Sequence, residues 1–205
     1  MSELNNLVNL NDLVGIKEFL IKNKNQINFF DKNGHSALHL ACLNNNEDIV
    51  KILISVPGID INLLTKDMTP LYYLDNEKDT ETALHIACIE GNKNIVDLLL
   101  SVESIDVNCV AGNGDTPLHV ACYSEQSIEI VKSLTSNPST NINCLDFYGN
   151  TPLYLSCMEN AYEVVKHLIG CNGIDVFLKN KFGESAIECA KYNENEKIIN
   201  LLENV

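Results

Sequence analysis

Basic residues are scarce in this sequence. The 205-residue chain has 14 lysine and arginine residues against 28 aspartate and glutamate residues, a formal net charge of −14. A chain with this charge repels phosphate backbones, so composition argues against nucleic-acid binding. Proline and glycine are also few, at 5 and 10 residues, while 45% of the chain is hydrophobic. This composition argues against a largely disordered chain and predicts a globular unit with a sizeable core.

Long apolar runs are missing as well. The run "LLLSV" at residues 98–102, for example, is preceded by Asp97 and followed by Glu103, whereas a membrane-spanning helix needs about 20 apolar residues. The first residues, "MSELNNLVNLNDLV", have neither the basic region nor the apolar segment of a secretory signal. The sequence therefore predicts a soluble protein without a membrane partner, located in the cytoplasm or alternatively in the nucleus.

Catalytic signatures are absent too. There is no G-x-S-x-G, no phosphate-binding G-x-x-x-x-G-K-[ST] and no zincin motif. The alternating acids Asp75, Glu77 and Asp79 begin like a calcium loop, but Thr80 stands where that loop needs glycine and Ile86 where it needs glutamate. We therefore expect no enzyme activity, no metal site and no cofactor.

Two short motifs recur along the chain, which indicates internal repeats. Most steps are 33 to 35 residues, and each series has a single step of 46 at the same place. The first motif occurs as "SALHLAC" from Ser36, "TALHIAC" from Thr82, "TPLHVAC" from Thr116, "TPLYLSC" from Thr151 and "SAIECAK" from Ser185. The second is an apolar pair at Ile16/Phe19, Val50/Leu53, Val96/Leu99, Val131/Leu134, Val165/Leu168 and Ile198/Leu201.

Each repeat is predicted to form two helices and a loop. The Ser or Thr is an N-cap residue, and Pro117 and Pro152 follow at the first helical position. Asn45, Gly91 and Asn160 tolerate a left-handed conformation and end the first helix. A second amphipathic stretch such as "NIVDLLLS" follows, then a short extended run such as "SIDVN" and a turn rich in Gly and Asn. Such short helices are stable only when neighbouring repeats stack.

The phrases "GNGDTPLHVAC", "NIVDLLL" and "IDVN" resemble the ankyrin repeat. The resemblance implies an all-α repeat fold, an ankyrin-type solenoid of stacked helix-turn-helix units with hairpin-like loops. The sequence departs from the family pattern where Tyr72, Tyr154 and Glu188 replace its histidine. Residues 1–205 would form a single array: an N-terminal cap unit at 1–30, repeats at 31–62, 82–110, 111–144 and 145–178, a C-terminal cap unit at 179–205, and an extra stretch at 63–81.

The extra stretch has two interpretations. It contains "TPLYYL" from Thr69, which is typical of a first helix, but no second-helix motif follows before Thr82. It is either a loop insertion or a remnant repeat that has kept only its first helix. We favour the insertion, because a helix without a partner would leave Leu71 and Leu74 unpacked. Loop insertions cost little, so the stretch is either a functional finger or an accident without function.

Recurring cysteines and histidines are interpreted as structural. Four cysteines share one repeat position, and stacked helices about 8–10 Å apart are too distant for disulfides to close. We therefore expect small buried thiols in a reducing compartment. The resemblance implies that the recurring histidine holds the first helix to the adjacent turn. These residues are Cys42, Cys88, Cys122 and Cys157, and His39, His85 and His119.

The resemblance implies a protein–protein interaction module, an adaptor or scaffold whose concave face binds a partner. The alternatives are a regulator that occludes an enzyme or transcription factor through the same groove, and an enzyme or metal-binding protein. We expect a monomer whose partner is another protein, with a basic one favoured by charge. The candidate first-helix residues are Leu43, Asn44, Ile89, Glu90, Tyr123, Ser124, Met158 and Glu159, and the candidate loop-tip residues are Asn113, Asp115, Phe147, Tyr148, Asn150 and Phe182. Of these, Leu43, Ile89, Tyr123 and Met158 would form an apolar row, which is either a partner interface or half-buried packing between repeats.

Overall fold

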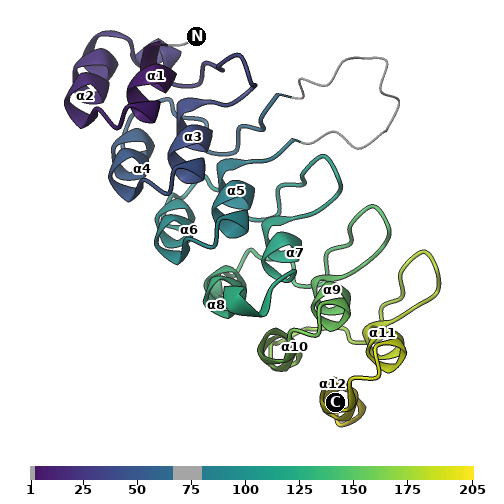
Figure 1. The fold of residues 1–205 in the computed structure, drawn as a ribbon. Helices are drawn as coiled ribbons and strands as arrows, with labels where there is room; N and C mark the ends of the chain where they lie inside the picture. Colours follow the sequence, from purple (N-terminus) through teal and green to yellow (C-terminus); the bar gives the residue numbers. More distant parts are fainter. Residues whose placement is uncertain (1–2, 67–79) are drawn as a thin grey trace, which may run out of the picture. The chain divides into compact units, whose positions relative to one another are not determined.

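The computed structural model describes residues 3–66 and 80–205, and within these ranges it contains α-helices, two short 3-10 helices and no strand (Figure 1). The helices are α1 (Glu3–Asn9), α2 (Leu13–Lys22), η1 (Lys24–Gln26), α3 (Ala37–Leu43), α4 (Glu47–Ile54), α5 (Ala83–Ile89), α6 (Lys93–Leu100), α7 (Pro117–Ala121), η2 (Glu125–Ser127), α8 (Ile128–Ser136), α9 (Pro152–Met158), α10 (Tyr162–Ile169), α11 (Ala186–Tyr192) and α12 (Glu196–Glu203).

The chain divides into two compact units, Met1–Asn113 and Gly114–Val205. In the first unit, the first helices α1, α3 and α5 form one row and the second helices α2, α4 and α6 form another (Figure 1). In the second unit, α7, α9 and α11 form one row and α8, α10 and α12 the other. Each described repeat is thus a helix-turn-helix pair, as the sequence predicts.

The predicted helix boundaries are confirmed by the capping geometry. Ser36, Thr82, Thr116 and Thr151 have extended backbones, and each side chain accepts a hydrogen bond from a backbone N–H in the first turn. In three repeats the second residue after the first helix has a positive φ, namely Asn45 at 52°, Gly91 at 70° and Asn160 at 56°.

The core lies between the two rows of helices in each unit. In α4, α6, α8 and α10 both residues of the apolar pair are inaccessible to solvent, for example Val50 and Leu53 in α4 and Val165 and Leu168 in α10. Burying one such side chain contributes roughly 1.5–3 kcal/mol, so stacking rather than helix propensity stabilises these two-turn helices.

The N-terminal region keeps a first helix although it lacks the Ser/Thr motif. Helix α1 packs against α3 and buries Leu4 and Val8. The Asn5 side-chain amide donates to the carbonyl oxygen of His35 at 2.8 Å. Residues 3–22 therefore form a complete helix pair, with an amide in place of the lost motif as the link to the next loop.

The predicted extended run after each second helix contains a turn instead. In the first unit, the Leu63 N–H donates to the carbonyl oxygen of Asp60 at 3.4 Å, and the Asp60 carboxylate accepts from the Asn62 N–H at 3.2 Å. The cause is local, because an aspartate side chain that bonds the backbone two residues ahead favours a turn over an extended strand.

Backbone hydrogen bonds at the base of the loop show how many residues the extra stretch adds. In regular loops the N–H of residue i donates to the carbonyl of residue i+4, as from Asp146 to Asn150 at 3.0 Å. The Thr65 N–H donates in the same way to the carbonyl of Glu81 at 2.9 Å. Fifteen residues (66–80) thus separate the pair instead of three (147–149), so the loop has twelve additional residues. The choice between insertion and remnant repeat concerns residues 67–79, which lie outside the described residues.

Candidate functional site

The loop tips of the second unit are built around buried polar side chains. The Asp146 carboxylate accepts hydrogen bonds from the Tyr148 N–H at 2.7 Å and the Asn150 N–H at 2.8 Å, and from the Asn150 side-chain amide at 2.9 Å. In the following loop, the Asn180 side chain accepts hydrogen bonds in the same way from the N–H groups of Phe182 and Glu184. Each tip is therefore held in one conformation by its own residues.

These loops present aromatic side chains to solvent. Phe147 and Tyr148 are each about half exposed, and Phe182 is 73% exposed. The turn after Tyr148 requires glycine at position 149, because the φ of Gly149 is +78° and a Cβ there would lie 3.0 Å from the Lys181 backbone nitrogen. The Lys181 N–H in turn donates to the Tyr148 carbonyl oxygen at 2.9 Å. The two neighbouring tips are thus joined by a main-chain hydrogen bond.

The predicted first-helix residues of the second unit are on the surface to different degrees. Tyr123, Met158 and Glu159 are exposed, whereas Ser124 is half-buried and its hydroxyl donates to Gln126 at 2.6 Å. Asn150, a tip residue, is half-buried as well because its amide is bound to Asp146.

Asp115 does not belong to the exposed set, which corrects the prediction that it contacts a partner. Its side chain is only 2% exposed. The Tyr123 hydroxyl donates to the Asp115 carboxylate at 3.4 Å, and burial together with this negative charge raises the pKa of Tyr123. Asp115 therefore orients an exposed tyrosine instead of meeting a partner itself.

In the first unit, Leu43, Ile89, Asn44, Glu90 and Asn113 are all exposed. The Asn44 side-chain amide donates to the Asn9 side chain at 3.4 Å, a long hydrogen bond between neighbouring repeats. The predicted apolar row of four residues has two members in each unit, so its continuity stays a prediction.

One exposed residue of this row was missed by the sequence analysis. Tyr192 follows Ser185 by seven residues, as Tyr123 follows Thr116. It is 88% exposed at the end of α11. The repeat spacing places Tyr192 at the same position as Tyr123, but the motif "SAIECAK" is atypical and the two residues were not matched.

The recurring histidines have the structural role that the resemblance implies. The Ser36 N–H donates to Nδ1 of His39 at 3.0 Å, so Nε2 carries the proton and donates to the carbonyl oxygen of Leu63 at 2.8 Å. His119 does the same between Thr116 and the carbonyl of Asn150, at 3.1 Å each. Burial lowers the pKa of His39 to about 4, so the ring is neutral at pH 7.

The cysteines are all free, and Cys42, Cys88, Cys122 and Cys157 are buried as predicted. Burial raises the pKa of the Cys42 thiol, and that of Cys144 to about 11. Such thiols are poor nucleophiles and poor ligands, since the thiolate is the reactive form. Among residues 3–66 and 80–205, no three His, Cys, Asp or Glu side chains are grouped closely enough to hold a metal ion.

We expect the intact mass of the native protein to be unchanged by reductant, with no zinc co-purifying. A thiol reagent should modify the half-exposed Cys109 and Cys171 first and the buried cysteines only after denaturation. Intact-mass and metal analysis of native and denatured protein measure both. One equivalent of zinc per chain would contradict the assignment of the cysteines to packing.

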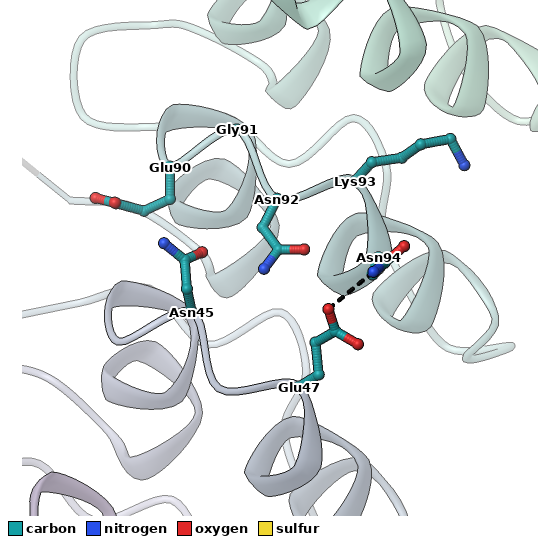
Figure 2. Close-up of a pocket in the computed structure, with 7 residues that line it drawn as sticks. All are labelled: Asn45, Glu47, Glu90, Gly91, Asn92, Lys93 and Asn94. Atoms are coloured by element: carbon teal, nitrogen blue, oxygen red, sulfur yellow. Dashed lines mark hydrogen bonds between the residues drawn. The ribbon is translucent and has the colours of Figure 1, made fainter.

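A polar hollow of about 350 Å³ lies where the turns of two repeats meet in the first unit (Figure 2). Its polar groups make hydrogen bonds that stabilise the fold. The Asn94 side-chain amide donates to the Glu47 carboxylate at 2.8 Å, and the Asn92 side chain accepts from the Ile95 N–H as the N-cap of α6. It holds no pair of nucleophile and base. The lining residues are Asn45, Glu47, Glu90, Gly91, Asn92, Lys93 and Asn94.

Asparagines after the second helices link successive repeats. The Asn143 amide donates to the carbonyl of Gly173 at 2.8 Å and its oxygen accepts from the Asp175 N–H at 2.9 Å. Asn62 makes the same pair of bonds to Ser104 and Asp106. These side chains therefore act as clamps between repeats.

Replacing Asn143 by alanine should lower the free energy of unfolding by roughly 1–3 kcal/mol, because two hydrogen bonds to the next repeat are lost. The thermal midpoint should fall by roughly 2–4 °C per kcal/mol in a chain of this size. Thermal unfolding followed by circular dichroism tests this. Asn200→Ala on α12 is the matched control and should cause no loss. Equal midpoints for Asn143→Ala and the parent would contradict the clamp.

No helix within the described part of the chain is long and apolar enough to cross a bilayer.

Comparison with known proteins agrees with this geometry. A family model of three ankyrin repeats matches residues 6–74, 66–146 and 125–204, so the chain belongs to the ankyrin repeat family. Ankyrin repeats are generally modules that bind other proteins. The crystal structure of EF0377, an ankyrin repeat protein, superposes with a TM-score of 0.83 at 25% identity, covering 98% of this chain and 96% of that one.

A curated relative matches over a short segment. Over 60 residues this chain is 47% identical to the SMC5-SMC6 complex localization factor protein 1 of Bos taurus. The segment is 27% of this chain and 6% of that protein, so the match concerns a small part of the relative's length.

Proposed function

We propose that this protein is an adaptor or scaffold that binds another protein through its first helices and loop tips. The observation that carries the proposal is the set of exposed aromatic side chains, Phe147, Tyr148 and Phe182, on loops fixed by Asp146 and Asn180. Aromatic residues are enriched where proteins bind each other, and exposed apolar patches indicate interaction sites.

The stiffness of the loops supports binding. Ordering a flexible loop on association costs free energy, and a loop already held by its own hydrogen bonds avoids that cost. The neighbouring Tyr123 and Met158 extend the set of apolar contacts on the second unit. The chain's charge of −14 favours a basic partner. Free cysteines suit a reducing compartment, so we place the protein in the cytoplasm or nucleus, as a monomer.

The test is affinity capture from the native cell followed by mass spectrometry, with three forms of the chain as bait. The parent and Phe177→Ser, which removes a 79% exposed aromatic outside the tips, should capture the same partner. The triple variant Phe147→Ser, Tyr148→Ser, Phe182→Ser should lose it at least tenfold while keeping its thermal midpoint. Equal capture by the triple variant would refute the proposed surface.

A further inference from the structure

We propose that the first unit carries a second binding surface, a groove between α2 and α4 that takes a short acidic, amphipathic helix of a partner protein. The groove is a hollow of about 390 Å³. It lies on the second helices, whereas the proposed adaptor surface uses first helices and loop tips, so it does not depend on that function. The lining residues are Lys17, Leu20, Ile21, Lys24, Ile52, Ser55, Val56 and Pro57.

The groove continues onto an exposed apolar stripe of α2. Val14, Lys17 and Ile21 are spaced three and four residues apart, so they lie on one side of the helix. Val14 is 68% exposed and Ile21 is 74% exposed. Two large aliphatic side chains exposed beside an apolar hollow are unusual on a helix whose opposite side, with Ile16 and Phe19, is already buried in the core.

The equivalent groove of the next repeat lacks this character, so stacking alone does not require it. By repeat spacing, Ser55 stands at the position of Ile21, Gly58 at that of Lys24, and Glu103 at that of Pro57. The groove between α4 and α6 therefore has a hydroxyl in place of an exposed aliphatic chain and a carboxylate in place of proline. The next repeat keeps a lysine, Lys51, at the position of Lys17, but it lacks both the exposed aliphatic chain and the second lysine.

The charge at the groove determines which partner fits. Lys17 and Lys24 are exposed, and within the described ranges no carboxylate lies within ion-pairing distance of either one. By contrast, Lys51 pairs with Glu47 and Asp48 on its own helix. Two unpaired lysines flanking an apolar hollow on a strongly acidic chain attract carboxylates and disfavour a basic segment.

The volume of the groove and its position between two helices favour a helical partner segment. A hollow of about 390 Å³ between two helices accepts a few aliphatic side chains. An amphipathic helix delivers such side chains at i, i+3 and i+4 into a groove of this kind. Lys17 lies on α2 and Lys24 begins η1 just after that helix ends, so the two lysines can meet carboxylates at different points along a short bound helix.

The experiment is a selection of displayed random twelve-residue peptides on the folded full chain, with counter-selection on Ile21→Ser. Ile21→Ser installs the residue of the next repeat on an exposed position, so the fold is preserved. We expect enriched peptides to combine spaced aliphatic residues with net negative charge. Their affinity should fall at least tenfold for Ile21→Ser and for Lys17→Glu with Lys24→Glu. Lys166→Glu with Lys197→Glu, which changes total charge equally on α10 and α12, should leave the affinity within twofold.

Four results would overturn the proposal. The selection could yield no peptide that depends on Ile21, or it could yield peptides without net negative charge. Alternatively, the chain could bind vesicles of phosphatidylserine through the same residues with no peptide enriched, which would make the surface a membrane contact. Equal loss of affinity in the Lys166→Glu, Lys197→Glu variant would show general charge attraction instead of a groove.

Discussion

Deleting residues 67–78 and changing Thr80 to glycine should give a folded chain whose thermal midpoint is at or above that of the parent. The deletion removes the twelve additional residues and leaves the order Thr65, Lys66, Asp79, position 80, Glu81. This matches the regular loop of Asp31, Lys32, Asn33, Gly34 and His35.

The glycine is required by backbone geometry. Gly34 has φ +83° and its carbonyl oxygen accepts from the Lys66 N–H, and the Thr80 carbonyl accepts from the Gly112 N–H in the same way. A β-branched residue is strained at positive φ, so the same deletion with Thr80 retained is the matched control and should melt lower. The longer deletion of Thr69–Glu81 would also remove the carbonyls that pair with Thr65 and Gly112.

The expected gain comes from loop closure. A shorter loop costs less closure entropy, although the saving grows only slowly with length. If residues 67–79 instead formed a packed remnant helix, the deletion would remove Leu71 and Leu74 at roughly 2–5 kcal/mol each. A midpoint lower by many degrees in the glycine variant would therefore refute the insertion. A retained midpoint with lost partner capture would show that the stretch functions in binding.

The sequence predicts this fold well because its signals are local. The cap at Thr116, Pro117 after it and the left-handed Asn45 each act within one helical turn, so motif and structure agree. The extra length was less accurately predicted. The step of 46 residues exceeds the shortest regular step of 33 by thirteen, while the hydrogen bond from Thr65 to Glu81 gives twelve additional residues, because steps of 33 and 34 residues both occur.

The candidate surface was predicted less completely because exposure depends on tertiary contacts. Asp115 and Asn113 belong to one loop, yet Asp115 is buried beneath Tyr123 and Asn113 is exposed. No sequence motif separates the two. The groove between α2 and α4 was also not predicted, since it requires knowing that Ile21 lies beside Val56 and that, among residues 3–66 and 80–205, no carboxylate is within ion-pairing distance of Lys17.

Replacing His39 by alanine should lower the free energy of unfolding at pH 7 by roughly 2–4 kcal/mol. The ring links the backbone of Ser36 to the carbonyl oxygen of Leu63 and is almost inaccessible to solvent. Its loss leaves buried polar groups without a partner and opens a cavity. Chemical denaturation at pH 7 measures the change. A variant as stable as the parent would show that the link contributes nothing.

The same residue should make the parent sensitive to acid. Its pKa is about 4 in the folded state and near 6.5 in the unfolded chain, because burial opposes protonation. Between those values the unfolded state binds the proton first, so stability is complete above pH 6.5 and falls as the pH drops toward 4. From pH 7 to pH 5 this single site should cost about 2 kcal/mol. The His39→Ala variant should lose about that much less than the parent over the same interval, since other titrating groups affect both proteins alike. Parallel pH profiles for the two proteins would contradict the assignment, and a steeper fall in the parent is the expected result.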